Sequence, residues 1–426
     1  MNWIETLDSC PPRRNVPNDG RSAFQQDADR IVFSSAFRRL QNKTQVHPLP
    51  HTDFVRTRLT HSMEVASVGR SLGGQVARRL LELGQTERRH IAADLGDIVA
   101  AACLAHDIGN PPFGHTGEQA MQQWFAEHAD MAFGDDLTDA EQADFLRFEG
   151  NAQGFRILTR LQMDRNEGGM RLMDATLGAF TKYPSGAAAA QGRAASYVGR
   201  KKHGFMQAEA ALFAELAARL KLAPQPDAAQ AWQRHPLAYL VEAADDICYS
   251  VIDVEDGVKL GRIGFSEAEE LFKPIIGADL GSRYLARSAD EKLSTLRSRT
   301  IGSLIDACCA AFVAQAPEKS LADVTPHGEQ VRKLKNLAMA RVYRWERTVT
   351  KELEGIAVIQ RLLDLFVGAL NARAGHVTAE RLLDLVPHYD RAAPRYQRLL
   401  AVTDYISGMT DRYAMDMQQQ LREIKI

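Results

Sequence analysis

The 426-residue chain contains no run of about 18 uncharged apolar residues, so we expect no membrane-spanning helix. The first ten residues, MNWIETLDSC, lack a basic stretch followed by an apolar one, and we therefore expect no signal peptide and a cytoplasmic location. Neither sign of charge is in excess, since 52 basic and 54 acidic residues leave a formal net charge of -2. This balance excludes a global attraction to nucleic acid or to anionic membranes, so any binding site for anions must be local.

Cysteine is also scarce. The five cysteines form no C-x-x-C pair and no zinc-finger spacing, and they are Cys10, Cys103, Cys248, Cys308 and Cys309. Most of them lie in apolar stretches, which predicts buried, reduced thiols in place of disulfides. A chain of this length buries enough apolar surface to need no such cross-links. The adjacent Cys308 and Cys309 are expected in the core, with a redox-sensitive pair as the alternative.

Alternating strand patterns are rare and helical periodicity dominates, which predicts an all-α fold. Residues 61–84 repeat apolar side chains every three or four positions and predict an amphipathic helix with Thr60 as its N-cap. Residues 92–107 are more uniformly apolar and predict a buried helix that Gly-Asn-Pro-Pro ends. Further helices are predicted over residues 23–40, 115–128, 150–163, 206–221, 236–260, 350–371 and 378–386. We expect at most a short hairpin, near 42–56 or 170–183, and loops at 184–204 and 223–230.

The segment LAHDIGNPPFGHTGE carries the clearest chemical signal. His106 and Asp107 are adjacent, so on a regular helix their side chains diverge by about 100°. At the last turn of a helix the geometry is looser, and both side chains can reach one cation. A divalent cation satisfies a buried histidine and a buried aspartate together. On its own the dipeptide is a weak signal, because a capping or hydrogen-bonding role explains it equally well.

Two other segments strengthen the metal hypothesis. His61 opens the helix predicted over residues 61–84, in TRLTHSMEV. In EAADDICYSVIDVEDG, the residues Asp245, Tyr249 and Asp253 recur every four positions and share one face of a helix. The alternative is a solvated face, but the isoleucines and valines between these residues leave little room for one.

Taken together, these motifs resemble the deoxyguanosine triphosphate triphosphohydrolase (dGTPase) family of the HD superfamily. The resemblance covers residues 20–260, in the family's order, through RSAFQQDADRIVFSSAFRRLQNKTQV, RTRLTHS, AHDIGNPPFGHTGE, RFEGNAQGFRIL, LGAFTKYP and EAADDICYSVIDVEDG. It implies an all-α HD-type catalytic core over residues 1–260, with its HD motifs between about 58 and 250. We expect residues 261–426 to form a helical extension packed on that core. We expect no cluster of chemically useful residues in the extension, and an inter-subunit role for it.

The resemblance implies one divalent metal ion per subunit, held by His61, His106, Asp107 and Asp245. Asp246 competes for the last position. The family's tyrosine and aspartate, four and eight residues after the ligand, match Tyr249 and Asp253 and favour Asp245. Two imidazoles and two carboxylates suit Mn, Fe, Co, Ni or Zn, and Mg less well.

The implied reaction is hydrolysis of a deoxynucleoside triphosphate, dGTP or another dNTP, at its α-phosphorus. The products are the deoxynucleoside and inorganic triphosphate. The 5′-oxygen is a poor leaving group unless it is protonated, so a general acid is needed. We expect His115 to be that acid and Glu118, three residues later, to hold its ring. The alternative is an ordinary surface pair of histidine and glutamate.

The resemblance also suggests substrate contacts. The predicted phosphate contacts are Arg58, Asn110, Lys182, Tyr183 and Lys202, with Lys201 as the alternative to Lys202. The predicted base and sugar contacts are Gln41, Tyr249 and Asp253, and Glu149 and Asn151 are expected to line the same cleft. We expect Tyr249 to crowd C2′ and exclude ribonucleotides, while solvated surface charge is the alternative for the lysines.

Two other functions stay open. One is a different HD phosphohydrolase, such as a 5′-nucleotidase or a cyclic-nucleotide phosphodiesterase. The other is a nucleotide-sensing or single-stranded-DNA-binding protein without turnover, which would use the basic stretches Arg13–Arg14, Arg38–Arg39 and Arg200–Lys202. Relatives further suggest a homo-oligomer, a tetramer or a hexamer, and a second nucleotide as activator.

Overall fold

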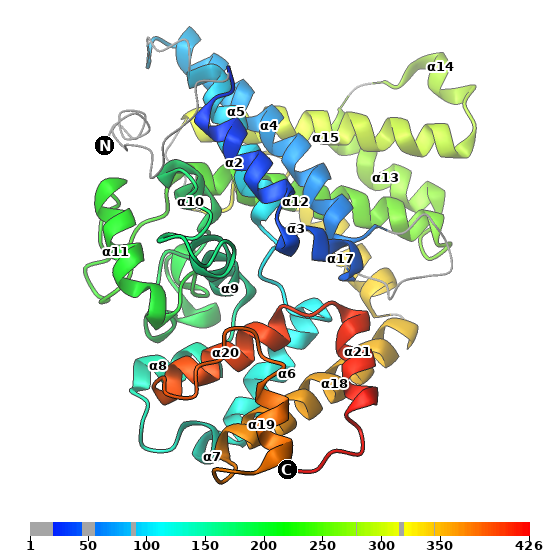
Figure 1. The fold of residues 1–426 in the computed structure, drawn as a ribbon. Coiled ribbons are helices and arrows are strands. Elements are labelled where there is room, and N and C mark those ends of the chain that lie inside the picture. The colour runs from blue at the N-terminus through cyan, green and yellow to red at the C-terminus, as the bar shows by residue number, and fades with distance from the viewer. Residues whose placement is uncertain (1–19, 45–55, 87–90, 278, 315–318, 345) are drawn as a thin grey trace.

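The chain folds into helices throughout the part that a computed structural model describes, residues 20–44, 56–86, 91–277, 279–314, 319–344 and 346–426 (Figure 1). In these residues β pairing occurs only as isolated bridges, such as that between Thr44 and Thr57. The predicted all-α class is therefore confirmed. The longer helices are α2 (Ala23–Val32), α4 (Arg58–Glu82), α5 (Ile91–Ala105), α6 (Gly114–Glu127), α8 (Asp139–Leu146), α11 (Ala210–Arg219), α12 (Pro236–Lys259), α13 (Phe265–Ile276), α15 (Ala289–Ala314), α17 (Gly328–Ala338), α18 (Glu346–Asn371), α20 (Arg395–Ser407) and α21 (Asp411–Gln420).

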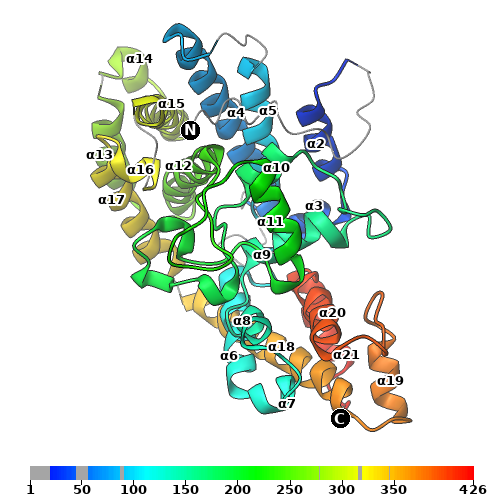
Figure 2. The ribbon, with the colours of Figure 1, turned by 90° about the vertical axis from the view of Figure 1, so that its left-hand side faces the viewer.

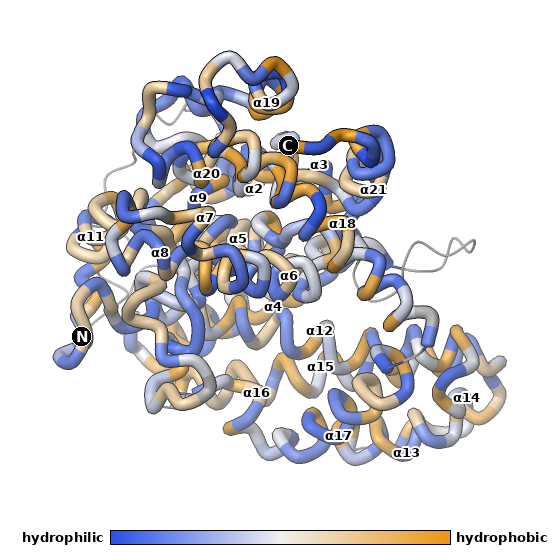
Figure 3. Tube along the Cα trace, turned by 90° about the horizontal axis from the view of Figure 1, so that it is seen from below, coloured by the Kyte–Doolittle hydropathy of each residue, from blue (hydrophilic) through white to orange (hydrophobic). Residues whose placement is uncertain are grey.

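Shorter helices and single turns connect these elements. They are α3 (Ser35–Arg39), η1 (Leu40–Asn42), α7 (Ala129–Phe133), α9 (Gly150–Arg156), η2 (Ile157–Leu161), α10 (Asp174–Phe180), η3 (Ala187–Ala189), η4 (Gly192–Ala194), η5 (Val198–Arg200), η6 (Gln207–Glu209), α14 (Gly281–Leu285), α16 (Leu321–Val324), η7 (Met339–Tyr343) and α19 (Val377–Leu383). The alternation of hydrophobic and hydrophilic residues along the helices is visible in Figure 3.

Buried hydrophobic side chains form two clusters. The first joins α4, α5 and α12 to α2 and α10, and it extends to α13, α15 and α17. The second joins α6, α7 and α8 to α18, α19, α20 and α21 (Figures 1 and 2). Apolar packing therefore continues across residue 260, where the division into core and extension was predicted, and that division stays a prediction.

The closest helix pair is α4 and α5, and glycines permit its approach. A Cβ atom at Gly73 would lie 2.5 Å from the carbonyl oxygen of Leu95, and one at Gly69 would lie 2.6 Å from Sγ of Cys103. Interiors are too densely packed to accept such contacts without backbone shifts. This packing fixes the two helices that lead to His61 and His106.

Several local predictions need correction. Helix α4 begins at Arg58, and its N-cap is Thr57, because Thr57 exchanges capping hydrogen bonds with Thr60; the prediction of Thr60 as N-cap was wrong. The single helix predicted over 23–40 is broken after Val32, since the Ser34 hydroxyl accepts from Phe37 N–H and starts α3. A hairpin at 170–183 is also wrong, because α10 occupies that segment. The short hairpin predicted near 42–56 stays a prediction, because residues 45–55 lie outside the described residues.

Other predictions are confirmed. Cys103, Cys248, Cys308 and Cys309 are free and buried, while Cys10 lies outside the described residues. No helix in the described part of the chain is both long enough and apolar enough to cross a membrane.

The α4–α5 contact predicts opposite effects for two adjacent glycines. Gly73→Ala should destabilise the protein by about 1–3 kcal/mol, because the methyl group meets the α5 backbone. Gly74 is the control, since a Cβ there meets nothing within 4 Å. Gly74→Ala should stabilise α4 by about 0.5–1 kcal/mol through helix propensity. Urea unfolding measures both, and equal effects of the two changes would contradict this packing.

Candidate active site

Three predicted metal ligands meet where α4, the end of α5 and α12 converge. One ligand atom each from His61, His106 and Asp245 lies within 4.8 Å of the other two. Nε2 of His61 is 3.2 Å from Oδ1 of Asp245, and Nε2 of His106 is 3.7 Å from the same oxygen. Asp107 extends the group, because its Oδ1 lies 3.6 Å from Nε2 of His106.

The end of α5 orients His106. Helix α5 stops at Ala105, so His106 and Asp107 lie in the turn that follows, as the Gly-Asn-Pro-Pro sequence predicted. Nδ1 of His106 lies 2.7 Å from the carbonyl oxygen of Cys103. Since a carbonyl only accepts, Nδ1 carries the proton, and the lone pair of Nε2 faces the cluster. Backbone bonds of this kind commonly orient metal-binding histidines.

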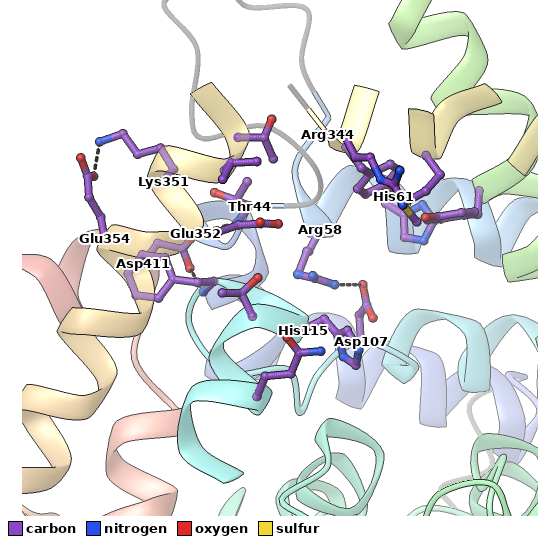
Figure 4. Close-up of a pocket in the computed structure, with 18 of the residues that line it drawn as sticks. Thr44, Arg58, His61, Asp107, His115, Arg344, Lys351, Glu352, Glu354 and Asp411 are labelled. Carbon is purple, nitrogen blue, oxygen red and sulfur yellow. Dashed lines mark hydrogen bonds and ion pairs between the residues drawn. The ribbon is translucent and has the colours of Figure 1, made fainter. Parts of the chain in front are cut away.

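Asp107 is held by two side chains. Arg58 donates from Nη1 to Oδ2 of Asp107 at 2.7 Å (Figure 4). Asn110 donates from Nδ2 to Oδ1 of Asp107 at 2.6 Å. Burial raises the pKa of Asp107, but the charges of Arg58, His106 and His61 together outweigh it, so the pKa lies below its ordinary value. The carboxylate is therefore ionised and oriented.

The two neighbouring aspartates of α12 have different surroundings. Asp245 faces His61, and although burial raises the pKa of Asp245, the hydrogen bond from His61 and the nearby histidines lower it below its ordinary value. Asp246 instead accepts from Lys335 at 2.7 Å and from Ser320 at 2.9 Å. The geometry therefore supports Asp245 over Asp246 as a metal ligand.

The chemistry of this donor set fits a divalent transition metal. Two imidazole nitrogens and carboxylate oxygens suit Mn, Fe, Co, Ni or Zn better than Mg. His61 is 3% exposed, and a buried imidazole next to buried carboxylates is stabilised by a shared cation.

A second group of polar side chains surrounds His115. Nδ1 of His115 lies 2.6 Å from Oε2 of Glu118, and Oε1 of Glu118 accepts the Gly150 N–H at 2.7 Å. Lys202 lies 2.8 Å from Glu149 and 3.9 Å from Glu118. The hydrogen bond to Glu118 raises the pKa of His115 above its ordinary value, while burial and Lys202 act to lower it.

Burial, reinforced by the charge of Glu118, raises the pKa of Glu149 to about 7. Lys202 and Asn151, which donate to Glu149, act in the opposite direction. Of the two carboxyls, Glu118 has the lower pKa. The hydrogen bond with His115 and the charge of Lys202 lower the pKa of Glu118 and outweigh the effect of burial. The raised pKa of Glu149 beside the ionised Glu118 reflects the cost of two adjacent buried charges of one sign.

One cavity of about 950 Å³ connects the two groups. Its lining includes His61, Asp107 and Asp245 from the first group and His115 and Lys202 from the second. Arg58 lines it as well, and the buried Nε of Arg58 has no hydrogen-bond partner among the described residues. A volume of this size is typical of small-molecule sites.

Tyr249 and Tyr343 form one wall of the cavity. Their rings stack with centroids 5.7 Å apart, and the Tyr343 hydroxyl donates to Oδ2 of Asp253 at 2.7 Å. Burial raises the pKa of Asp253 to about 7 and that of Tyr249 to about 12. We call His61, His106 and Asp245 the donor cluster. The predicted stripe of Asp245, Tyr249 and Asp253 thus runs along α12 from the donor cluster to the buried Asp253 carboxyl, which is hydrogen-bonded to Tyr343.

Comparisons with known proteins agree with this geometry. The HD domain family matches residues 58–146, and the phosphohydrolase-associated domain family matches residues 325–420. A deoxyguanosinetriphosphate triphosphohydrolase-like protein of Pseudomonas aeruginosa is 44% identical over 423 residues, 94% of each chain. A protein of the same description from Synechocystis is 40% identical over 422 residues, 95% of each chain. The deoxyguanosinetriphosphate triphosphohydrolase of Klebsiella pneumoniae is 33% identical over 512 aligned positions, covering 100% of this chain and 98% of that relative.

This chain belongs to the deoxyguanosinetriphosphate triphosphohydrolase family of the HD superfamily. The family resemblance drawn from the motifs is thereby confirmed. HD domains are metal-dependent, and in the donor cluster of His61, His106 and Asp245 both histidines lie within the matched HD segment, while Asp245 follows later on α12.

Several substrate contacts predicted for this dGTPase-family chain lie away from the cavity lining. Gln41 is exposed on η1. Lys182 pairs with Glu242 at 3.4 Å, and Tyr183 is buried with the Arg234 guanidinium 5.5 Å from its ring centre. These residues keep their predicted roles as hypotheses, but the structure brings Arg58, Lys202 and Tyr249 directly to the cavity.

The C-terminal region supplies residues that the sequence analysis missed. Tyr343, Arg344 and Asp411 line the cavity, although no cluster of chemically useful residues was expected after residue 260. The sequence did not reveal these residues, because Asp411 lies far from Tyr343 and Arg344 along the chain and the three follow no ligand spacing. The only local signal was polar residues at helix ends, such as Asp411 at the start of α21.

The different surroundings of Asp245 and Asp246 predict different metal contents. Asp245→Asn should abolish binding of one divalent ion, because the amide removes a charged ligand beside two imidazoles. Asp246→Asn is the control, since Asp246 bonds to Ser320 and Lys335. Elemental analysis of the purified variants measures both, and full metal content in Asp245→Asn would contradict the assignment.

Proposed function

We propose that this chain is a metal-dependent dNTP triphosphohydrolase, which cleaves dGTP or another dNTP into deoxynucleoside and inorganic triphosphate. One observation carries the proposal: the donor cluster and the His115–Glu118 pair open into the same cavity. A metal cluster alone would suit any HD phosphohydrolase. An acid that opens into the same cavity as the metal ligands suits a reaction whose leaving oxygen must be protonated.

His61, His106, Asp107 and Asp245 would hold the metal ion. The chemistry that a divalent ion supplies when bound to such ligands is polarisation of a phosphoryl oxygen and activation of water. Arg58 supplies a positive charge from the chain itself, since it pairs with Asp107 and lines the cavity. Arg58 is 8% exposed, so its charge acts in a poorly hydrated site and attracts a phosphate strongly.

His115 is placed to act as general acid toward the 5′-oxygen. Its Nδ1 is occupied by Glu118, so Nε2 is the nitrogen available to donate a proton. The side chain is 67% exposed, which leaves the ring accessible from the cavity. The ionised Glu118 raises the pKa of His115 above its ordinary value and so favours the protonated imidazole, and its bond from the Gly150 N–H keeps the pair in place.

Tyr249, Tyr343 and Asp253 are suited to bind the sugar. The stacked tyrosines present a flat wall, and Asp253 is fixed by the Tyr343 hydroxyl. A tyrosine close to C2′ would exclude a ribose hydroxyl by contact. Specificity for deoxyribose would then come from Tyr249 on α12, which stacks on Tyr343 of η7.

The wider predictions remain proposals of the same kind. These are a cytoplasmic location, a homo-oligomer, a nucleotide activator and binding of single-stranded DNA. For DNA, the stretch Arg200–Lys202 offers less charge than its sequence suggests, because the buried Arg200 pairs with Asp227 and Lys202 with Glu149. Arg13–Arg14 lies outside the described residues.

Product analysis tests the reaction. With each dNTP and Mn²⁺ or Co²⁺, the protein should release deoxynucleoside and triphosphate in equal amounts. His115→Ala should lower kcat about 10²- to 10⁴-fold, because it removes the acid, and should leave the metal content unchanged. Release of dNMP or orthophosphate would contradict the proposal, and normal turnover by His115→Ala would contradict its role.

The pH dependence tests the link between His115 and Glu118. Activity that needs protonated His115 is full below its raised pKa and is lost as the pH rises through that value. Glu118→Gln removes the negative charge that raises this pKa, so the alkaline limb of kcat should move to lower pH. Lys202 and Glu149, the other titratable groups that act on the pKa of His115, are not substituted in this variant. An alkaline limb at the wild-type pH would show that Glu118 does not set the pKa of His115.

A further inference from the structure

The turn between Asp107 and His115 has an unfavourable backbone conformation. Phe113 has φ of 62° and ψ of 14°, and Gly114 has φ of 58°. Glycine adopts this left-handed region freely, but a bulky residue such as phenylalanine does so rarely and only where its surroundings hold it. Gly114 also leaves space for Arg58, since a Cβ there would lie 2.3 Å from Nη2 of Arg58.

Asp411 is the first contact that holds this turn. It is the first residue of α21 and is 6% exposed. Its Oδ1 accepts the Phe113 N–H at 2.9 Å, and its Oδ2 accepts the Thr44 N–H at 2.9 Å. One carboxylate therefore joins the start of α6 to an N-terminal segment and to the C-terminal helices.

Gly355 is the second contact. It lies in the middle of α18, where the Phe113 ring packs on the helix backbone. A Cβ at Gly355 would lie 2.6 Å from Cγ of Phe113 and 2.9 Å from its Cδ1. No real side chain fits at such a distance, so the position of the ring depends on glycine at this site.

A third contact secures the other end of the turn. The buried Lys43 donates to the carbonyl oxygens of Asn110 and Ser407, and Ser407 ends α20. The turn is thus bonded to the C-terminal helices at Asn110 and at Phe113. His115 follows two residues later, in the first turn of α6, so its backbone position is set by these contacts.

We propose that Asp411 and Gly355 are positioning residues, which fix the Phe113–Gly114 turn and thereby place His115 for proton transfer. The proposal rests on the function of His115 proposed above. Glu118 is anchored separately, through the Gly150 N–H and Lys202. A displaced turn therefore moves His115 relative to a carboxylate that stays in place.

Two variants and a matched control test this. Gly355→Ala places a methyl group against the Phe113 ring, and Asp411→Asn loses one of the two N–H acceptors. Gly368→Ala is the control in the same helix, because a Cβ there meets Ile426 at an ordinary 3.6 Å. The two variants should lower kcat about 10- to 100-fold with KM within about twofold, as expected for a misplaced catalytic group. Gly368→Ala should retain wild-type kcat, and all three should retain metal.

A second measurement follows His115 directly and does not require turnover. In protein labelled with ¹³C-histidine, with His115→Ala to assign the signal, the ring titration of His115 should move to lower pH in Gly355→Ala and Asp411→Asn. It should be unchanged in Gly368→Ala. If the wild type released no triphosphate, the proposed function would fail, while this titration would still decide whether the turn positions His115.

A double variant separates positioning from general damage to the fold. Phe113→Gly removes the ring and accepts the left-handed backbone. Adding Gly355→Ala to Phe113→Gly should then lower kcat no further, because the methyl group no longer meets a ring. Additive losses, or a wild-type His115 titration in Gly355→Ala and Asp411→Asn, would overturn the proposal.

Discussion

The ion pair between Arg58 and Asp107 is the interaction on which the site depends. It joins the first turn of α4 to the turn after α5, the two places that present His61 and His106. Buried ion pairs add little net stability, because desolvation offsets the attraction, but losing one partner leaves an uncompensated charge. The pair therefore acts mainly on orientation. It directs Asp107 toward the donor cluster and keeps Arg58 at the cavity, against the backbone of Gly114.

The two hydrophobic clusters explain why the cavity exists. The first carries the donor cluster on α4, α5 and α12, and the second carries His115 on α6, which packs against α18. The chain passes from the first cluster to the second between Asp107 and His115. Seven residues thus separate Asp107, a predicted metal ligand, from His115, the predicted acid. Contacts from the C-terminal helices, such as that of Asp411 with Phe113, hold this segment. Substrate would bind between the helices of the first hydrophobic cluster and those of the second, and this turn connects the two.

The metal ligands predicted from local sequence patterns lie close together in the structure. His61, His106 and Asp107 stand in motifs whose neighbours fix their geometry, such as the Gly-Asn-Pro-Pro that ends α5. Tyr249 and Asp253, four and eight residues after Asp245, matched the family's pattern and favoured Asp245 over Asp246 as the ligand. The segment 23–40 was predicted as one helix because its apolar periodicity continues without a break. The break depends on a single hydrogen bond, from Phe37 N–H to the Ser34 hydroxyl, which periodicity does not reveal. Tyr343, Gly355 and Asp411 could not be predicted, because each acts through a residue far away in sequence, and no spacing marks such pairs.

The central claim is that water attacks the α-phosphorus while His115 protonates the departing 5′-oxygen. Hydrolysis of dGTP in ¹⁸O-labelled water tests it most directly, with the position of the label read by mass spectrometry. The account predicts one ¹⁸O atom in the inorganic triphosphate and none in the deoxyguanosine. Label in the deoxyguanosine, or in an orthophosphate or pyrophosphate product, would contradict it.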